Sequence, residues 1–372
     1  VYILFHKWTP SAVFLNLKFP TRLFKIISTS FFLLQIDKFP RPSILTIMSP
    51  KIYTFLLLFL RLTLPALSDK CPDRDKLPTT CECEEQFTYG DVDVELSCTG
   101  STIEELEDTV RVMDKNARIE VQLDDMKLGD LPSRIFYGLN VVRLEISHCE
   151  LDGLAPPGEA PFQGLEDKLE VLVITSSFTE EVRLTALHSL AHLIRLTELD
   201  LSYNAITEVR NDWFSLSPPA LSRLSLSNNG IEKLGDRAFE NLANLEDLEL
   251  HGNRFGPIKR SMLPKSAYRL EKLELDNNDF TSVPDDLFLD MPALKVLSIR
   301  TNRIPRLEER AFKPIWSQLD VFDARGNPLE CDSAMEWLFR VKTEAALVLG
   351  SCQGPFGREG MELDDFIENR GQ

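Results

Sequence analysis

The chain has 372 residues, of which 41 are Lys or Arg and 58 are Asp or Glu, so its formal net charge at pH 7 is −17. An acidic chain is a poor candidate for a nucleic-acid binder, because affinity for phosphates comes from clustered Lys and Arg that displace counterions. With 43% hydrophobic and 27% charged residues, the composition is that of a folded protein and not of a disordered or collagen-like one.

The first 47 residues differ in composition from the rest of the chain. They contain six basic residues, one acidic residue and no Met, and the first Met of the sequence is Met48. We expect translation to begin at Met48. Residues 1–47 are then either upstream sequence that is not translated or a disordered extension.

A secretory signal peptide is predicted over residues 48–68. Lys51 supplies its basic start, residues 52–60 form an apolar run, and Ala66-Leu67-Ser68 has the small-x-small pattern of a cleavage site. The alternative is that residues 1–47 belong to the protein and that the apolar run anchors it in a membrane, but nine residues fall well short of the ~20 that span a bilayer. Removing residues 1–68, whose net charge is +7, changes the net charge of the chain from −17 to −24.

A repeat of 24 or 25 residues dominates the rest of the chain. Five segments fit the template L-x-x-L-x-L-x-x-N-x-L-x-x-L, and they begin at Leu196, Leu221, Leu245, Leu270 and Leu294. Weaker copies begin at Arg118, Val141, Leu169 and Leu319, which gives nine in all. The template is identified as the leucine-rich repeat, over residues 118–330.

Each repeat predicts one strand with a buried face, because apolar and polar residues alternate, as they do over residues 198–202. A single coil is too short to fold without neighbours, whereas stacked coils bury both faces of each layer and need caps at the ends. The resemblance therefore implies an α/β solenoid. We expect a leucine-rich repeat horseshoe with a parallel concave sheet, a convex side of irregular segments, 3-10 turns and short helices, and disulfide-bonded caps.

The ninth position of the template carries a recurrent Asn. It resembles the ladder Asn of the family, whose side-chain amide binds backbone groups where the strand turns. The predicted ladder consists of Asn204, Asn229, Asn253, Asn278, Asn302 and Asn327. Cys149 occupies the same position of its coil, so we expect it to be buried and unpaired. A Phe near the nineteenth position is expected to form a buried convex spine of Phe136, Phe162, Phe214, Phe239, Phe288 and Phe312.

Four Cys precede the repeats, at positions 71, 81, 83 and 98, and they predict a cap over residues 69–117. Their C-x-C pair between two outliers resembles the N-terminal cap of extracellular leucine-rich repeat proteins, although the spacings here are longer. The resemblance implies the bridges Cys71–Cys83 and Cys81–Cys98, whereas the sequence by itself allows three connectivities. A zinc site is the competing interpretation, but no His lies near these cysteines in the sequence.

A second cap is predicted over residues 331–372. The segment NPLECDSAMEWL resembles the C-terminal cap of the family, which usually reads N-P-x-x-C-D-C-x-x-x-W-L, with Ser333 in place of the second Cys. No Cys follows Cys352, so both members of one expected bridge are missing, and the resemblance implies the single bridge Cys331–Cys352. Disulfides agree with the signal peptide in placing the chain outside the cell.

No catalytic signature is present, and the sequence predicts neither an enzyme nor a cofactor. It contains no G-x-S-x-G, Walker A or H-E-x-x-H motif. His188 and His192 are four residues apart and could share a helix face, but no carboxylate or Cys stands at metal-ligand spacing beside them. We therefore expect no metal site.

The concave face is the surface on which we expect partner binding. Acidic residues dominate its middle and basic residues its C-terminal end. The predicted contact residues are Glu145, Asp200, Tyr203, Glu249, His251, Glu274, Asp276, Arg300 and Arg325. Glu249 and Glu274 lie one strand apart and are expected to repel each other by ~1 kcal/mol, an arrangement that favours a cationic partner or a bound cation. A less polar patch of Val171, Val173 and Phe178 is a second candidate contact, and simple solvation of an acidic protein is the alternative to both.

These features predict a secreted protein-binding scaffold whose partner is an extracellular protein with a basic surface. The alternative is a non-catalytic stabilising subunit of a secreted enzyme, since the chain is loosely similar to arthropod proteins grouped with the non-catalytic subunit of the shrimp luciferin monooxygenase. A receptor ectodomain is less favoured, because the last 20 residues show neither an apolar span nor a lipid-anchor signal. The mature chain is expected to have no stable membrane span, and the sequence contains no N-x-S/T glycosylation sequon.

Overall fold

The computed structural model describes residues 70–86, 92–178, 190–341 and 347–368. All of them belong to one compact unit, formed by Lys70–Gln86 and Gly90–Gln372. The segment 1–47, the expected signal peptide over residues 48–68 and His188 lie outside the described residues. No helix within the described ranges is both long enough and apolar enough to cross a bilayer.

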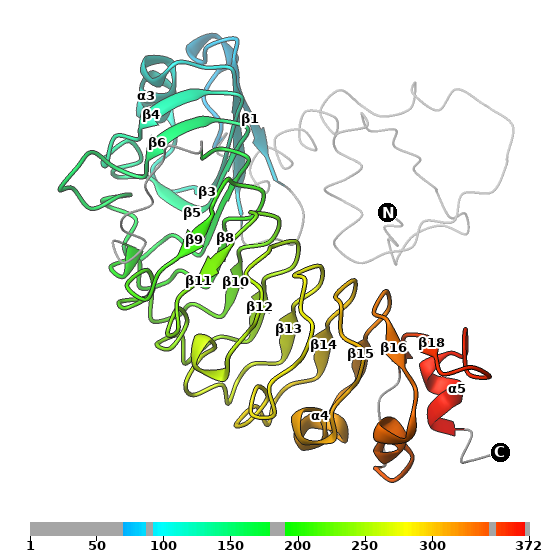
Figure 1. Cartoon of the computed structure of the whole chain (residues 1–372). Coiled ribbons are helices and arrows are strands. Elements are labelled where there is room, and N and C mark those ends of the chain that lie inside the picture. Colours follow the sequence, from blue (N-terminus) through cyan, green and yellow to red (C-terminus); the bar gives the residue numbers. More distant parts are fainter. Residues whose placement is uncertain (1–69, 87–91, 179–189, 342–346, 369–372) are drawn as a thin grey trace, which may run out of the picture. The chain divides into compact units, whose positions relative to one another are not determined.

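A twelve-stranded sheet runs through this unit, in the order in which the strands occur along the chain (Figure 1). The first two strands, β1 (Cys81–Glu85) and β2 (Val94–Thr99), are antiparallel, and all later neighbours are parallel. The nine repeats supply β3 (Arg118–Asp124), β5 (Asn140–Ser147), β7 (Val171–Thr175), β8 (Glu198–Asp200), β10 (Arg223–Ser225), β12 (Asp247–Glu249), β13 (Lys272–Glu274), β14 (Val296–Ser298) and β15 (Val321–Asp323). One parallel strand per repeat confirms the predicted leucine-rich repeat solenoid.

Two parallel strands lie outside the nine repeats that the template identifies. The strand β2 pairs with β3 at the N-terminal end, and β17 (Leu347–Leu349) pairs with β15 at the C-terminal end. Neither segment carries the full leucine pattern, so neither was included among the nine repeats predicted from the sequence. The solenoid sheet therefore continues into the sequences that flank the repeats.

The strands stack in register, which places the leucines of successive coils in one column. Leu199, Leu224, Leu248 and Leu273 lie directly opposite one another and are buried. Their chain neighbours on both sides remain partly exposed or exposed. Alternate residues of each strand therefore point into the core and out of the sheet.

Smaller elements close the coils away from the twelve-stranded sheet. Three two-stranded ladders pair β4 (Lys127–Asp130) with β6 (Glu150–Gly153), β9 (Glu208–Val209) with β11 (Lys233–Leu234), and β16 (Leu329–Glu330) with β18 (Cys352–Gly354). The 3-10 turn η4 (Arg260–Met262) lies between β12 and β13, and the helix α4 (Glu309–Trp316) lies between β14 and β15. All six Phe residues expected in the spine are buried, and neighbouring rings contact each other, as in Phe214–Phe239 (centroids 5.7 Å apart) and Phe288–Phe312 (5.5 Å).

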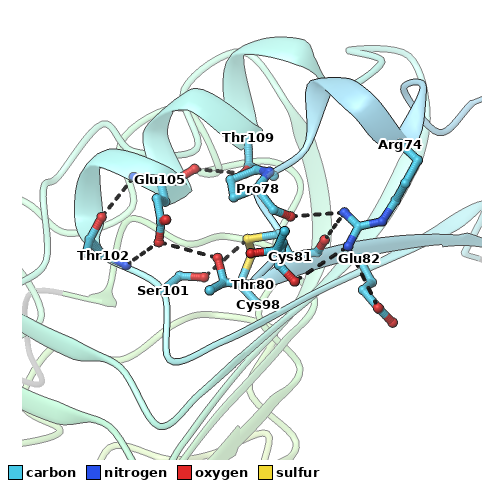
Figure 2. The surroundings of a disulfide bond; sticks show 11 residues. Arg74, Pro78, Thr80, Cys81, Glu82, Cys98, Ser101, Thr102, Glu105 and Thr109 are labelled. Carbon is cyan, nitrogen blue, oxygen red and sulfur yellow. Dashed lines mark hydrogen bonds and ion pairs between the residues drawn. A yellow bond between two sulfur atoms is a disulfide. The ribbon is translucent and has the colours of Figure 1, made fainter.

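Two disulfides, Cys71–Cys83 and Cys81–Cys98, lie before the first repeat and are the pairs that the family resemblance implies. Figure 2 shows the surroundings of the second. The adjacent helix α3 (Ile103–Val112) begins with a capping box: Thr102 Oγ1 accepts from the N–H of Glu105, and Glu105 Oε2 accepts from the N–H of Thr102. The same carboxylate accepts from Thr80 Oγ1 (3.3 Å), which joins the start of β1 to the helix.

The C-terminal end is closed by the disulfide Cys331–Cys352, again the pair that the resemblance implies. The 3-10 helix η5 (Ser333–Phe339) buries Trp337, whose Nε1 donates to the carbonyl of Leu307 at 2.8 Å. The helix α5 (Leu363–Glu368) buries Leu363 and Phe366. These side chains cover the apolar surface that the last coil of a repeat array otherwise exposes.

Ladder side chains connect each coil to the coil before it. Asn302 Oδ1 accepts from the backbone N–H groups of Asn278 (2.9 Å) and Phe280 (3.1 Å). Its Nδ2 donates to the carbonyls of Leu275 and Ile299, both at 2.9 Å. All six predicted ladder Asn residues are buried, so these bonds satisfy backbone groups that water cannot reach.

The first three repeats use other residues at the ladder position. These are Met126, Cys149 and Ser177, and Cys149 is buried and not disulfide-bonded. Ser177 Oγ accepts from the N–H of Cys149 (3.1 Å) and donates to the carbonyl of Thr175 (2.8 Å). The hydroxyl thus makes one accepted and one donated backbone hydrogen bond of the kind that the ladder Asn side chains make. We did not predict this role for Ser177 from the sequence, although it occupies the ninth position of the repeat that begins at Leu169.

The residue before each ladder position adopts a left-handed backbone conformation in all nine repeats. These residues are Asp125, His148, Ser176, Tyr203, Asn228, Gly252, Asn277, Thr301 and Gly326, with φ between 50° and 72°. Gly and Asn enter this region at low cost, whereas bulky and β-branched residues are strained there. Each coil therefore turns through the same backbone step after its strand.

We predict that Asn302→Ala destabilises the protein more than Asn278→Ala. Removing Asn302 leaves acceptor and donor partners unpaired, whereas Asn278 Oδ1 has no hydrogen-bond partner in the described part of the chain and its Nδ2 donates to Leu250 and Asp276. Each buried unpaired group costs about 1 to 3 kcal/mol, so the two losses should differ by at least about 1 kcal/mol. Urea unfolding followed by circular dichroism measures both, and equal losses would contradict the proposed role of the acceptor bonds.

Candidate protein-binding face

The repeats contribute three rows of residues across the sheet, on the side opposite the leucine columns, which we call the sheet face. Most of these residues are partly or fully exposed, and five are buried, namely Val173, Ser202, Ser227, Ser298 and Asp323. The first row is Glu120, Arg143, Val171, Glu198, Arg223, Asp247, Lys272, Val296 and Val321. The second is Gln122, Glu145, Val173, Asp200, Ser225, Glu249, Glu274, Ser298 and Asp323, and successive members of both rows are directly opposed on neighbouring strands. The third, two residues further along, is Asp124, Ser147, Thr175, Ser202, Ser227, His251, Asp276, Arg300 and Arg325.

The first row pairs acids with bases across neighbouring strands. Arg143 Nε lies 3.1 Å from Glu120 Oε1, and Arg223 binds Glu198 through an NH2 contact of 2.8 Å. In each pair the acid is on the earlier strand and the base is directly opposite on the next. Such cross-strand pairs contribute about 0.2 to 1 kcal/mol each and leave the row nearly neutral.

A cationic side chain also lies at the centre of the acidic stripe. Lys272 Nζ lies 2.5 Å from Glu249 Oε1, 2.9 Å from Glu274 Oε1 and 3.6 Å from Asp247 Oδ2. We expected Glu249 and Glu274 to face each other as an uncompensated pair of carboxylates, and this expectation is wrong, because the ammonium of Lys272 contacts both. We call Asp247, Glu249, His251, Lys272 and Glu274 the Lys272 cluster.

His251 completes the cluster through its Nδ1, which lies 3.2 Å from Glu274 Oε2 and 3.0 Å from Ser227 Oγ. The hydrogen bond to Glu274 raises the pKa of His251, and the same bond is the main cause that lowers the pKa of Glu274 to about 2. Burial raises the pKa of Asp247 to about 6. Burial opposes the charge of Lys272, but its hydrogen bonds to Glu249 and Glu274 raise its pKa.

The basic C-terminal end of the face is also paired internally. Arg325 lies 2.6 Å from Asp323 Oδ2, and Arg300 lies 3.6 Å from the same oxygen. Asp276 Oδ1 accepts from Ser298 Oγ (2.5 Å) and from the backbone N–H of Arg300 (2.7 Å). The cluster of bases that the sequence predicts is thus largely neutralised by carboxylates on the same face.

The remaining predicted contact residues have a different environment. Glu145 and Asp200 have no ion pair among the described residues, and Asp200 Oδ1 accepts one hydrogen bond, from the N–H of Ser202 (2.8 Å). Tyr203 is 61% exposed. The less polar patch expected nearby is smaller than predicted, because Val173 and Phe178 are buried, at 8% and 6% exposure.

One group on the face has the donor atoms for a metal ion. The ligand atoms of Glu249, His251 and Glu274 all lie within 4.8 Å of one another. The ammonium of Lys272 already contacts both carboxylates, so a metal ion would have to displace it. The arrangement in the folded chain is therefore that of an ion-pair network.

The free cysteine and two of the described histidines make contacts within the fold. The Cys149 thiol is buried, and burial raises its pKa to about 11, so it is protonated at neutral pH. His192 Nε2 lies 2.9 Å from the carbonyl of Pro161, a contact that ties it to the neighbouring coil. His251 is engaged by Glu274 and Ser227.

Fold and face together define the class of the molecule as a leucine-rich repeat solenoid with disulfides. The family model described as "Leucine rich repeat" matches residues 194–255 and 268–329. Leucine-rich repeat-containing protein 3B of Danio rerio is 30% identical over 147 residues, which are 39% of this chain and 43% of that protein. The chain thus matches less than half of the length of this curated relative.

A solved structure shares the fold. It is a chain of the octameric complex of Latrophilin 3, Unc5D and FLRT2, in which FLRT2 contributes its leucine-rich repeat domain. The TM-score is 0.50 at 19% identity, and the superposition covers 76% of this chain and 96% of that chain. At this identity the similarity concerns the fold.

We predict that His251→Gln lowers the stability of the protein more at acidic than at alkaline pH. A raised folded-state pKa means that the His251–Glu274 contact stabilises the fold fully below pH ~6.5 and that this contribution disappears as the pH rises through the folded-state value. Melting temperatures of both proteins at pH 5.5 and pH 9 provide the measurement. A difference of the same size at both values would show that the imidazolium has no special role.

We also predict that Lys272→Met destabilises the protein by about 1 to 3 kcal/mol at pH 7, because it leaves three carboxylates without their shared cation. Part of the loss should be recovered at pH 4.5, where the carboxylates begin to take up protons, and in the presence of Zn²⁺, which can take the vacated position. Lys295→Met is the matched control, because the Lys295 ammonium donates to the carbonyl of Gln318. Urea unfolding of both variants with and without Zn²⁺ measures these effects, and equal losses would contradict the bridging role.

Proposed function

We propose that this protein is a secreted protein-binding scaffold that engages an extracellular protein through its sheet face. The observation that carries the proposal is the register of the outward rows, which presents charged and hydroxyl side chains in fixed columns across nine strands. At ~4.8 Å per strand this face is about 40 Å long, enough for a protein interface of ordinary size. The leucine columns are buried, so the residues available to a partner are those of the sheet face and the other exposed surfaces.

The extracellular setting is supported by the chemistry of the caps. Disulfides persist in oxidising compartments, and this chain forms three of them. The predicted signal peptide is consistent with the same route. FLRT2, whose leucine-rich repeat domain belongs to a complex with Latrophilin 3 and Unc5D, is an example of this fold in an assembly of several proteins.

The partner we infer is a protein with a basic surface, because the chain is strongly acidic. Electrostatic complementarity of this kind raises the association rate and makes binding weaker at high salt. A stabilising subunit of a secreted enzyme remains the alternative function. It differs in one observable respect, since a subunit co-purifies with a single second polypeptide at fixed stoichiometry.

A glycan placed on the sheet face tests the proposal without changing its charge. Ser225→Asn creates the sequon Asn-Leu-Ser at residues 225–227, in the second row at the middle of the face. We predict that the glycosylated variant, expressed through the secretory pathway, captures partners from extracellular fluid at least about tenfold less well than wild type. Quantitative pull-down and mass spectrometry provide the measurement.

Two controls make the outcome interpretable. Ala243→Ser creates a sequon at Asn241, an exposed position away from the sheet face, and should leave capture unchanged. Ser225→Gln alters the same residue without a glycan and should also bind. Unchanged capture by the Ser225→Asn glycoprotein would show that the partner binds elsewhere.

A further inference from the structure

The ion pairs of the sheet face divide it into two parts. From β12 to β15, each outward carboxylate has an intramolecular partner: the Lys272 cluster holds three, Ser298 and the Arg300 backbone bind Asp276, and two arginines bind Asp323. A partner that bound these acids would first have to break the existing contacts. Their charges therefore contribute little to recognition.

The part from β5 to β10 has two carboxylates available for a partner. Arg143 and Arg223, the nearest bases of the first row, already bind Glu120 and Glu198. Glu145 and Asp200 are left without a cation among the described residues. Both lie directly opposite Val173, on its two sides, so their backbones are about 10 Å apart. A cationic group placed over the strand of Val173 would lie one strand spacing, about 5 Å, from the strand of each acid.

The strand between these two acids carries no charge on its outward side. Its outward residues are Val171 and Thr175, which are partly exposed, and Val173, which is 8% exposed, and Thr175 Oγ1 lies 3.1 Å from Ser147 Oγ. This strip is a weakly polar floor between two carboxylates. It suits the aliphatic stem of a Lys or Arg side chain, which buries its methylene groups while its charged end reaches an acid.

Tyr203 lies where the chain leaves β8, three residues after Asp200. It has a φ of 58°, a conformation that costs a bulky residue of the order of 1 kcal/mol, and four of the nine equivalent positions hold Gly or Asn. Tyr203 is 61% exposed, so burial in the core does not offset this cost. Tyr is enriched at protein interfaces, and its ring face attracts Lys and Arg.

We propose that the part of the sheet face formed by β5, β7, β8 and β10 binds a Lys- or Arg-bearing extended segment of the extracellular partner. The cationic side chain lies over Val173 between Glu145 and Asp200, and Tyr203 packs against the same segment. This inference rests on the proposed function and narrows it to one half of the face. It assigns a stability role, and no direct contact, to the Lys272 cluster.

Two charge-matched double variants test the location. Glu145→Gln with Asp200→Gln removes two carboxylates from the proposed site without creating a glycosylation sequon, and Glu249→Gln with Glu274→Gln removes two from the Lys272 cluster. The probe is the labelled peptide Gly-Ser-Val-Arg-Val-Ser-Gly, compared with the same peptide carrying citrulline in place of Arg. Affinities are measured by fluorescence anisotropy at low and at physiological salt, after melting curves establish that each variant is folded.

We expect wild type to prefer the Arg peptide, and the first double variant to bind it at least about fivefold more weakly. The second double variant should bind within about twofold of wild type. Equal losses in the two variants would mean that the peptide senses the overall negative charge, and this would overturn the assignment.

Tyr203→Gly separates a binding role from a structural one. Glycine accepts the left-handed backbone without strain, so this variant should be as stable as wild type or more stable, and yet bind the Arg peptide more weakly. Asn228→Gly, at the equivalent position of the next repeat, is the control and should not change binding. Unchanged binding by Tyr203→Gly would remove the aromatic contact from the proposal.

The same variants distinguish this inference from the proposed function. If the Ser225→Asn glycan blocks capture of natural partners while Glu145→Gln with Asp200→Gln captures them normally, the sheet face is the binding surface but the site assigned here is wrong. If neither change affects capture, the proposed function itself fails.

Discussion

The structure depends on one recurrent interaction, the hydrogen bonding of buried ladder side chains to the backbone of the preceding coil. In each of the nine repeats the strand is followed by a left-handed step, after which the chain turns toward the interior and backbone N–H and C=O groups lie away from water. An amide such as that of Asn302 satisfies both kinds of group at once, because it carries an acceptor and two donors. Stacking of the coils follows from this constraint as much as from the leucine columns.

The hydrogen bonds of the ladder also fix the register of the strands, and the register determines which side chains face each other on the sheet face. Because each coil is held at the same height as its neighbour, residues such as Glu198 and Arg223 lie directly opposite each other and form ion pairs. A slip of one residue would move every outward side chain into the core. The pattern of free and paired charges on the sheet face is thus a consequence of hydrogen bonds inside the solenoid.

The sequence predicted the features that depend on spacing, and the structure was needed for those that depend on side-chain reach. Leucines at fixed intervals predict strands, columns and fold, because period and burial are linked directly. The strands β2 and β17 lack that pattern and were missed. The bridging of Glu249 and Glu274 by Lys272 was also missed, since a row of residues gives no direction for a flexible side chain. The left-handed conformation of Tyr203 was missed as well, because the equivalent positions hold residues as different as Asp125, Ser176, Thr301 and Gly326 and so show no common residue type.

The positions of the disulfides determine how this molecule responds to tension. All three bridges close short loops at the two ends, with sequence separations of 12, 17 and 21, and no described crosslink joins one repeat to another. A pulling force applied between the ends passes through every repeat, and neighbouring coils resist it through non-covalent contacts. The array would therefore lengthen coil by coil while its ends stay folded, and each coil that opened would remove one strand from the sheet face.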